Sequence, residues 1–364
     1  MSEAVPVRYF PLLITLFLLI CCPLAALSED TGHEIFYADF TEGIAPGAKP
    51  EILYTGRTQL ALTMRSQPDK TSESLGVIGE KKTVQIFGYD TQWLFCWSDD
   101  VGVYYLQRSK NVDPIEAVDP ENTPPYGVIR QRYIATAAQD TALLAAPNED
   151  ADVIEEYPAG TRMSIWLIQD GWAVIPYRKI VGYLYVGDLM DLTPVAPDPQ
   201  TAQEGDILTT YTTFYSTKQT ELNIGRMENI RVGCLYIDQT YEPGFQFAFN
   251  SIAGPYTKAR GYKDSPVLID GATVTGSGGG TCQVSTTLYN ALLQLPDGLT
   301  VLYRRPHGPG GASYAPHGVD AAVGTDYLDL RFRNDFDFPI TIESTAQNGA
   351  LCICIRKGAY TPEN

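Results

Sequence analysis

An internal repeat in the first half of the 364-residue chain constrains the fold more than any other feature. Pro68 and Pro147 are each followed 25 residues later by a tryptophan, Trp93 and Trp172. Around both pairs, short runs that alternate apolar and polar residues are separated by turn-forming residues, a pattern typical of short β-strands. The repeat therefore predicts two small, strongly bent β-barrels, at residues 55–112 and 130–192.

The second copy of the repeat has the clearer motifs. It contains Asp170-Gly171-Trp172-Ala173-Val174 and Val181-Gly182-Tyr183-Leu184-Tyr185, whereas Thr91-Gln92-Trp93-Leu94-Phe95 in the first copy is a looser match. On these residues the two copies resemble bacterial SH3-like domains. The resemblance implies modules that dock on the cell wall or on a partner. The tryptophans suit stacking on a sugar or a peptide, but a place in the barrel core is the simpler interpretation.

The N-terminus has the layout of an export signal. Arg8 precedes an apolar run from Tyr9 to Leu27, and the chain turns polar at Ser28. Residues 1–28 are therefore interpreted as a cleaved signal peptide or a retained membrane anchor, followed by a loosely structured lead-in at residues 29–54. In either case the rest of the chain is expected outside the cytoplasm, secreted or membrane-anchored and associated with the cell wall. Only the N-terminal segment is expected to meet a membrane.

Charge and cysteine content narrow the functional classes. A net charge of -17 disfavours binding to nucleic acid, because the phosphate backbone would be repelled. Five of the seven cysteines lie beyond the export signal, and an odd number leaves at least one thiol unpaired within the chain. Cys352 and Cys354 alternate with apolar residues and are expected to be buried on one face of a strand. No metal site, nucleotide loop or cofactor site is predicted.

A Pro-rich stretch at residues 193–204 predicts a semi-rigid linker, and a third domain follows at residues 205–358. In this domain the Gly-rich run Thr275–Thr281 precedes Cys282. The apolar residues that follow recur at helical spacing and predict a helix from about 282 to 295. A thiol at a helix N-terminus is favoured as thiolate by the helix dipole, and nearby N–H groups suit an oxyanion. The alternative is a buried, purely structural cysteine.

A cysteine nucleophile needs a base, and two histidines of this domain are candidates, His307 and His317. Asp320 is a candidate for the group that orients an imidazole and supports its protonated form. Arg304 and Arg305 are suited to hold a carboxylate. In the alternative interpretation, the histidines and arginines are simply solvated loop residues.

The third domain resembles the VanW family. The resemblance rests on Pro243–Asn250, Arg260–Lys263, the run Gly278-Gly279-Gly280-Thr281-Cys282-Gln283-Val284, Arg305-Pro306-His307, and the closing Asp329–Asn334. The family pattern has a histidine at the position of His307 and no fixed residue at that of His317, so the resemblance ranks His307 first as the base. The fold class is therefore multi-domain and mainly β, with two SH3-like barrels followed by an α+β domain.

The resemblance also implies a function. Family members are linked to peptidoglycan and, by name, to glycopeptide resistance, and some are regarded as cysteine-dependent L,D-transpeptidases. The expected partner is peptidoglycan, through its stem peptides and also its glycan. A non-catalytic wall-binding or scaffold protein and a cysteine endopeptidase of the cell wall are the alternatives. The expected catalytic residues are Cys282, His307 and Asp320, and the expected substrate-binding residues are Gly279, Gly280, Gln283, Arg260, Arg305 and Tyr314.

Overall fold

The structure is a computed structural model that describes residues 49–90, 92–119, 126–269, 272–307, 312–316 and 318–359. The predicted export signal at residues 1–28 lies outside the described residues. Within the described ranges, no helix combines the length and the apolar character needed to cross a bilayer.

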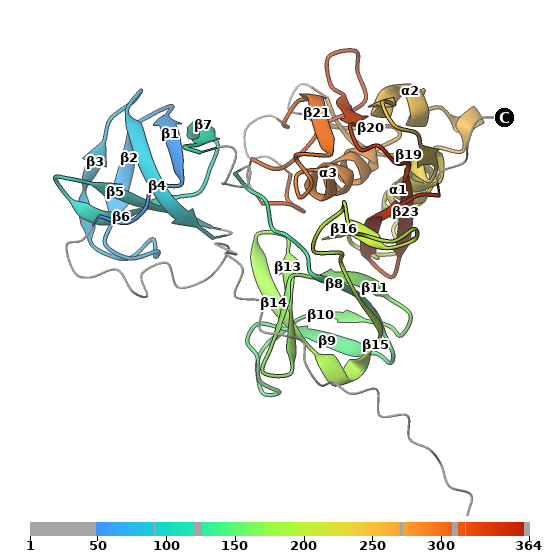
Figure 1. Cartoon of the computed structure of the whole chain (residues 1–364), viewed down its shortest axis with the longest axis horizontal. Helices are drawn as coiled ribbons and strands as arrows, with labels where there is room; N and C mark the ends of the chain where they lie inside the picture. The colour runs from blue at the N-terminus through green and yellow to red at the C-terminus, as the bar shows by residue number, and fades with distance from the viewer. Residues whose placement is uncertain are drawn as a thin grey trace, which may run out of the picture. The chain divides into compact units, whose positions relative to one another are not determined.

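The first copy of the repeat folds into an antiparallel sheet of seven strands. The strands are β1 (Tyr54–Thr58), β2 (Leu62–Arg65), β3 (Ser74–Ile78), β4 (Thr83–Tyr89), β5 (Trp93–Ser98), β6 (Gly102–Gln107) and β7 (Val112–Ala117). Their order is β3-β2-β6-β5-β4-β1-β7 (Figure 1). Because β3 and β7 end the sheet without pairing with each other, the described strands do not close into a barrel.

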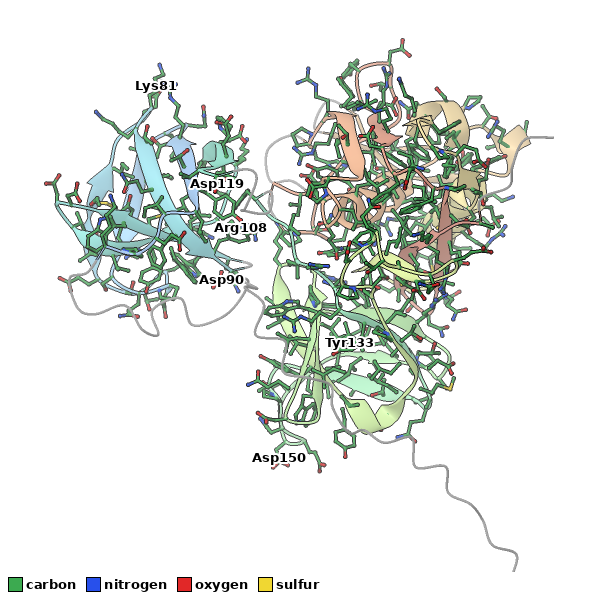
Figure 2. The ribbon with its side chains drawn as sticks, in the orientation of Figure 1. Lys81, Asp90, Arg108, Asp119, Tyr133 and Asp150 are labelled. Atoms are coloured by element: carbon green, nitrogen blue, oxygen red, sulfur yellow. The ribbon has the colours of Figure 1, made fainter. Side chains whose placement is uncertain are left out.

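A buried arginine fastens the segment that follows this sheet. The guanidinium of Arg108 lies over the rings of Tyr89 and Tyr126, at 4.8 and 4.9 Å. It also donates to the carbonyl of Asp90, and both of these residues are labelled in Figure 2. The Tyr89 hydroxyl accepts a hydrogen bond from the amide of Gly127. Stacking on aromatic faces suits the planar guanidinium, so one side chain joins the sheet to the start of the next segment.

The second copy of the repeat forms two smaller antiparallel sheets, ordered β10-β9-β14-β13-β12 and β11-β8-β15. Their strands are β8 (Tyr133–Ala137), β9 (Thr141–Leu144), β10 (Val153–Tyr157), β11 (Arg162–Ile165), β12 (Leu167–Gln169), β13 (Trp172–Tyr177), β14 (Ile180–Tyr185) and β15 (Leu189–Pro194), with the 3-10 helix η1 (Val186–Asp188) between the last two. The SH3-like assignment of the two copies stays a prediction.

The two repeated tryptophans occupy equivalent places. Trp93 opens β5 and Trp172 opens β13, and each of these strands is the first arm of an antiparallel hairpin. Trp93 is buried, whereas Trp172 is half-buried, with its ring edge-on to that of Tyr185. Both rings therefore contribute to local packing.

The C-terminal region combines three sheets with three α-helices among the described residues. The sheets are ordered β16-β24-β23-β17, β18-β22-β21 and β19-β20. The strands are β16 (Ile207–Phe214), β17 (Thr240–Tyr241), β18 (Gln246–Ala248), β19 (Asp264–Ile269), β20 (Ala272–Ser277), β21 (Leu299–Arg304), β22 (Leu330–Asn334), β23 (Ile340–Gln347) and β24 (Ala350–Lys357); the helices are α1 (Glu221–Ile237), α2 (Phe249–Ala253), α3 (Thr281–Leu292) and the 3-10 helix η2 (Lys258–Arg260).

Helix α3 is the helix that the periodicity predicts, and it ends slightly earlier than expected. It lies against β16, where Thr213 and Thr287 share a hydrogen bond of 2.6 Å (Figure 1). Helix α1 is longer but gives no periodic signal, because its buried face includes small and polar residues such as Gly225, Asn229 and Gly233. Apolar periodicity cannot detect such a face.

The core of the second copy of the repeat continues into the C-terminal region. Phe214 at the end of β16 packs against Tyr157 and Tyr177, with ring centroids 5.5 and 4.9 Å apart. Cys352 and Cys354 on β24 are buried free thiols, as the strand pattern predicts, and both contact the Thr210 hydroxyl. Val195 and Ala196, which the sequence assigns to a linker, are held by backbone hydrogen bonds to Arg132 and Ile207.

Phe214→Ala is expected to lower the free energy of unfolding by about 3–5 kcal/mol, because it empties a buried aromatic site. Urea denaturation monitored by tryptophan fluorescence measures the change. Leu235→Ala is the matched control, because Leu235 is 59% exposed. Its effect should stay within about 0.5 kcal/mol. Equal effects of the two substitutions would contradict the shared core.

Candidate active site

The Gly-rich run forms the end of the β19–β20 hairpin and the entry to α3. Gly278 and Gly280 have φ values of +87° and +110°, which only glycine adopts without strain, and Gly280 is the N-cap of α3. A buried side chain on α1 holds the loop: Asn229 Nδ2 donates to the carbonyl of Gly279 at 2.9 Å and to Ser265 Oγ at 2.9 Å. The side chain of Asn229 therefore fixes the glycine loop that leads into α3.

The structure places Gly279 and Gly280 in packing roles. A Cβ at Gly279 would lie 2.1 Å from the carbonyl oxygen of Pro266, and one at Gly280 would lie 2.9 Å from that of Arg226. These glycines therefore allow the backbone of α1 and of the hairpin to approach α3. The expectation that they contact a substrate gains no support from this position, because protein atoms already fill the space beside them.

Cys282 lies in the first turn of α3 and is half-buried, unlike the four other described cysteines, which are buried. Its Sγ lies 3.4 Å from the carbonyl oxygen of Val323 and 3.5 Å from the amide nitrogen of the same residue. The helix N-terminus places partial positive charge beside the sulfur. Cys282 is thus the most accessible thiol of the described part of the chain.

His307 and Asp320 form the second half of the site. His307 Nδ1 lies 2.6 Å from Asp320 Oδ2, and the same oxygen accepts the backbone amide of His307 at 2.7 Å. The Cys282 side chain is a second hydrogen-bond partner that raises the pKa of His307. The three predicted catalytic residues therefore lie in one chain of contacts: thiol, imidazole and carboxylate. His317 lies outside the described residues.

The electrostatics of the site favour a charged imidazole. Burial alone would lower the pKa of His307, but the hydrogen bonds to Asp320 and Cys282 outweigh it and raise the pKa to about 10. Burial likewise opposes ionisation of Asp320, yet the hydrogen bonds from His307 hold the pKa of this carboxyl below its usual range. These contacts favour a protonated His307 imidazole between the Asp320 carboxylate and the Cys282 side chain.

An extended segment, Val319–Val323, joins the helix to the histidine; it is called the strap below. Asn290 Nδ2 donates to the carbonyl of Val319 at 2.7 Å, and Ser285 Oγ to that of Ala321 at 2.6 Å. Thr286 Oγ1 accepts the amide of Ala321 at 3.0 Å. Together with the contacts of Cys282 to Val323, these bonds fix the strap along α3.

The other backbone groups of the strap face the end of β21. Arg304 Nε donates to the carbonyl of Asp320 at 2.7 Å, and the amide of Ala322 donates to the carbonyl of Arg305 at 2.8 Å. Arg304 also lies 3.7 Å from the Asp320 carboxylate. The carboxylate that Arg304 holds is therefore one of the chain's own, a positioning role that the sequence did not reveal.

Gln283 does not face a substrate. Its side chain is fully buried and its amide group donates to Thr213 Oγ1 and to the carbonyl of Phe214. Its Oε1 accepts a 2.5 Å hydrogen bond from Arg226 on α1. The expectation of a substrate-binding Gln283 is corrected to a role in orienting Arg226, a residue that escaped prediction because it lies on the helix without a periodic signal.

Two arginines, Arg260 and Arg305, were expected to bind substrate, but none of their described contacts involves Cys282. Arg260 stacks on the ring of Tyr236 at 4.0 Å and donates to the carbonyl of Ile252, so its guanidinium is engaged away from Cys282. Arg305 is exposed and donates to the Tyr303 hydroxyl. The placement gives neither of them a direct part in the site.

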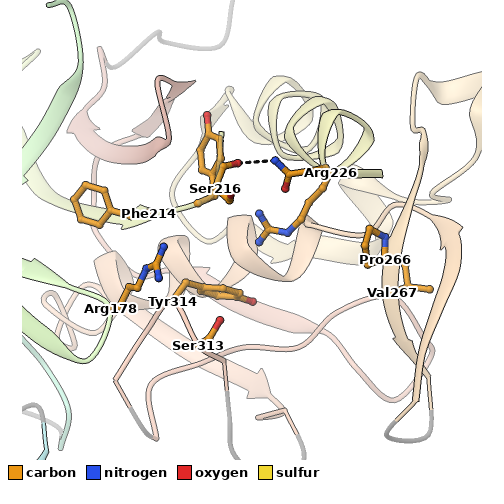
Figure 3. A pocket seen from close by; sticks show the side chains of 10 residues that line it. Arg178, Phe214, Ser216, Arg226, Pro266, Val267, Ser313 and Tyr314 are labelled. Atoms are coloured by element: carbon orange, nitrogen blue, oxygen red, sulfur yellow. Dashed lines mark hydrogen bonds between the residues drawn. The ribbon is translucent and has the colours of Figure 1, made fainter. Parts of the chain in front are cut away.

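Tyr314 does lie at the site. Its ring is edge-on to that of His307, with centroids 6.5 Å apart. Burial, and next the charge of Cys282, raise the pKa of its hydroxyl well above the usual range. Tyr314 also lines a cavity of about 470 Å³ (Figure 3). The remaining lining residues are Arg178, Phe214, Tyr215, Ser216, Asn223, Arg226, Pro266, Val267 and Ser313.

Comparisons with known proteins agree with the C-terminal part of this picture. The family described as VanW like protein matches residues 225–356. The uncharacterized protein YoaR of Bacillus subtilis is 34% identical over 146 residues, which cover 40% of this chain and 46% of the relative. The vancomycin B-type resistance protein VanW of Enterococcus faecalis is 36% identical over 100 residues, which cover 26% of this chain and 36% of the relative.

The chain spans less than half the length of these relatives. Among solved structures, NlpC2 from Trichomonas vaginalis aligns over 86% of this chain and 100% of its own at 11% identity, but the TM-score of 0.16 is too low for a conclusion about fold. The family match covers a part of the chain that includes Cys282, His307 and Asp320. The C-terminal region, residues 225–356, contains a VanW domain.

Proposed function

We propose that the protein is a cysteine-dependent acyl transferase that acts on peptide stems of the bacterial cell wall. The observation that carries the proposal is the chain of contacts from Cys282 through His307 to Asp320 at the first turn of α3. A thiol, a histidine and an orienting carboxylate in this order are the parts of a nucleophilic acyl-transfer site. The comparison with a protein named for vancomycin resistance supports the cell wall as the place of action.

In the proposed reaction, the Cys282 sulfur attacks the carbonyl carbon of an amide, and a carbon–sulfur bond forms. The carbon–nitrogen bond then breaks, and His307 gives its proton to the leaving amine. The thioester that remains passes its acyl group to the amine of a second stem, which returns a proton to His307. Backbone N–H groups at the start of α3 are suited to stabilise the oxyanion. Water in place of the second amine would make the same site an endopeptidase.

Reaction of the full-length chain with purified tetrapeptide stems tests the proposal directly. Mass spectrometry should show an acyl group on Cys282 and, with a second stem present, a cross-linked product. Cys282→Ala and Cys282→Ser should give neither, since a serine hydroxyl is not ionised by a helix terminus alone. Cys234→Ala is the matched control, because Cys234 is a buried thiol of the same domain and should leave the products unchanged.

Alkylation by iodoacetamide should label Cys282 first among the described cysteines, because the four others are buried. His307→Gln should slow the labelling by about tenfold or more, since the imidazolium supports the reactive thiolate. Peptide mapping by mass spectrometry gives the rate at each thiol. An inert Cys282 in the folded wild type would favour the alternative of a non-catalytic wall-binding protein.

The proton on His307 should be lost near pH 10, well above the ordinary range of an imidazole. Asp320→Asn removes the charge behind the first hydrogen bond that raises this pKa, so the titration should move to lower pH. Because the pKa of His307 is higher in the folded state than in the unfolded state, its protonated form stabilises the fold, and this contribution is complete below about pH 6.5. It disappears as the pH rises through about 10.

NMR titration of the imidazole protons measures the pKa, and His307→Gln assigns the signal. Glu343→Gln is a control, because this carboxylate pairs with Arg356 instead. A wild-type His307 that titrates near pH 6.5 would contradict the contact geometry.

A further inference from the structure

The cavity beside Tyr314 is lined by two arginines and by no acidic residue. Arg178 comes from the turn between β13 and β14, and Arg226 comes from α1. Figure 3 shows both guanidinium groups near the ring of Tyr314. The chain as a whole has 43 acidic and 26 basic residues, so two facing cations without a carboxylate run against its composition.

Arg226 is a half-buried cation that forms no ion pair with a carboxylate among the described residues. Its guanidinium donates a hydrogen bond to the neutral Gln283, and neither Arg226 nor Arg178 belongs to an ion pair in the described ranges. Burial lowers the pKa of Arg226, and the like charge of Arg178 acts in the same direction. A buried charge is costly without a partner, so this arrangement is suited to an anion that comes from outside.

Arg178 is exposed, and its guanidinium lies beside an aromatic ring. Its guanidinium lies 5.0 Å from the ring centre of Tyr177, and that ring packs against Phe214 with centroids 4.9 Å apart. Arg178 itself has a φ of +57°, as a tight turn between two strands requires. The second copy of the repeat thus contributes one side of the cavity, and the VanW domain contributes the other.

The cavity is adjacent to the nucleophile. Tyr314 lines it and also packs edge-on to His307. Cys282 is near enough to Arg226 and Tyr314 to act on the pKa of both side chains, in the raising direction. With a volume of about 470 Å³ the cavity is in the lower half of the usual range for ligand pockets, ~300–1,000 Å³. An anion held in it would therefore lie close to the carbonyl under attack.

We propose that Arg178 and Arg226 form a subsite for the free C-terminal carboxylate of the peptide substrate. Guanidinium groups hold carboxylates through paired, charge-assisted hydrogen bonds. The subsite would direct Cys282 to the carbonyl that precedes the last residue, so that this residue leaves as a free amino acid. The proposal rests on the proposed acyl-transferase function and adds to it a preference for peptide ends over peptide interiors.

The test uses the full-length chain and measures how a peptide protects Cys282 from iodoacetamide. The probes are the tetrapeptide L-Ala-γ-D-Glu-meso-diaminopimelyl-D-Ala and the same peptide with a C-terminal amide. The free acid should protect at a roughly tenfold lower concentration, the effect of one charge-assisted interaction. Arg226→Gln and Arg178→Gln should each reduce this difference severalfold.

Arg231→Gln is the matched control, because Arg231 is an exposed arginine of the same helix that is paired with Glu228. It should retain the full preference for the acid. Equal protection by acid and amide, no protection by either, or a preference that survives both arginine substitutions would overturn the subsite. The labelling rate of Cys282 without peptide stands apart from these outcomes: a fast rate leaves the acyl-transferase proposal in place, and an inert thiol removes it.

Discussion

The site depends on the two sets of hydrogen bonds that the strap makes. On one side, backbone groups of Val319, Ala321 and Val323 bond to side chains of α3. On the other side, those of Asp320 and Ala322 bond to the end of β21 and the residue after it. The strap therefore connects the helix that carries the thiol with the segment that carries the imidazole. Because Asp320 belongs to the strap, the same bonds hold its carboxylate against His307 at 2.6 Å.

A match between two repeat lengths makes this arrangement possible. Four residues of an α-helix advance by about 6.0 Å. Two residues of an extended chain advance by about 6.6 Å. Cys282, Thr286 and Asn290 follow one another at four-residue intervals and meet Val323, Ala321 and Val319 at two-residue intervals. One polar stripe of α3 thus bonds to the strap, while Gln283 and Thr287 bond to β16.

The sequence could predict the parts of this site that have a local signature. The glycine run, the thiol and the apolar face of α3 lie within one short stretch, so spacing alone identifies the helix. The pairing of Asp320 with His307 needs contacts between distant segments, and the family resemblance rather than spacing ranked His307 first. Arg226 and Asn229 stayed undetected because they lie on α1, whose buried face is partly polar. The polar spacing 282, 286, 290 was a signal that apolar periodicity ignores.

The alternation of the strap determines which changes the site tolerates. In most of its hydrogen bonds to α3 and β21 the strap contributes backbone N–H and C=O groups. Most substitutions of a strap residue leave these groups in place. Chain length is different, because one inserted or deleted residue would exchange the groups that face the helix with those that face the strand. Asp320 would then turn away from His307 while every catalytic side chain remained in the sequence. The geometry of this site is therefore encoded in a residue count as much as in residue identity.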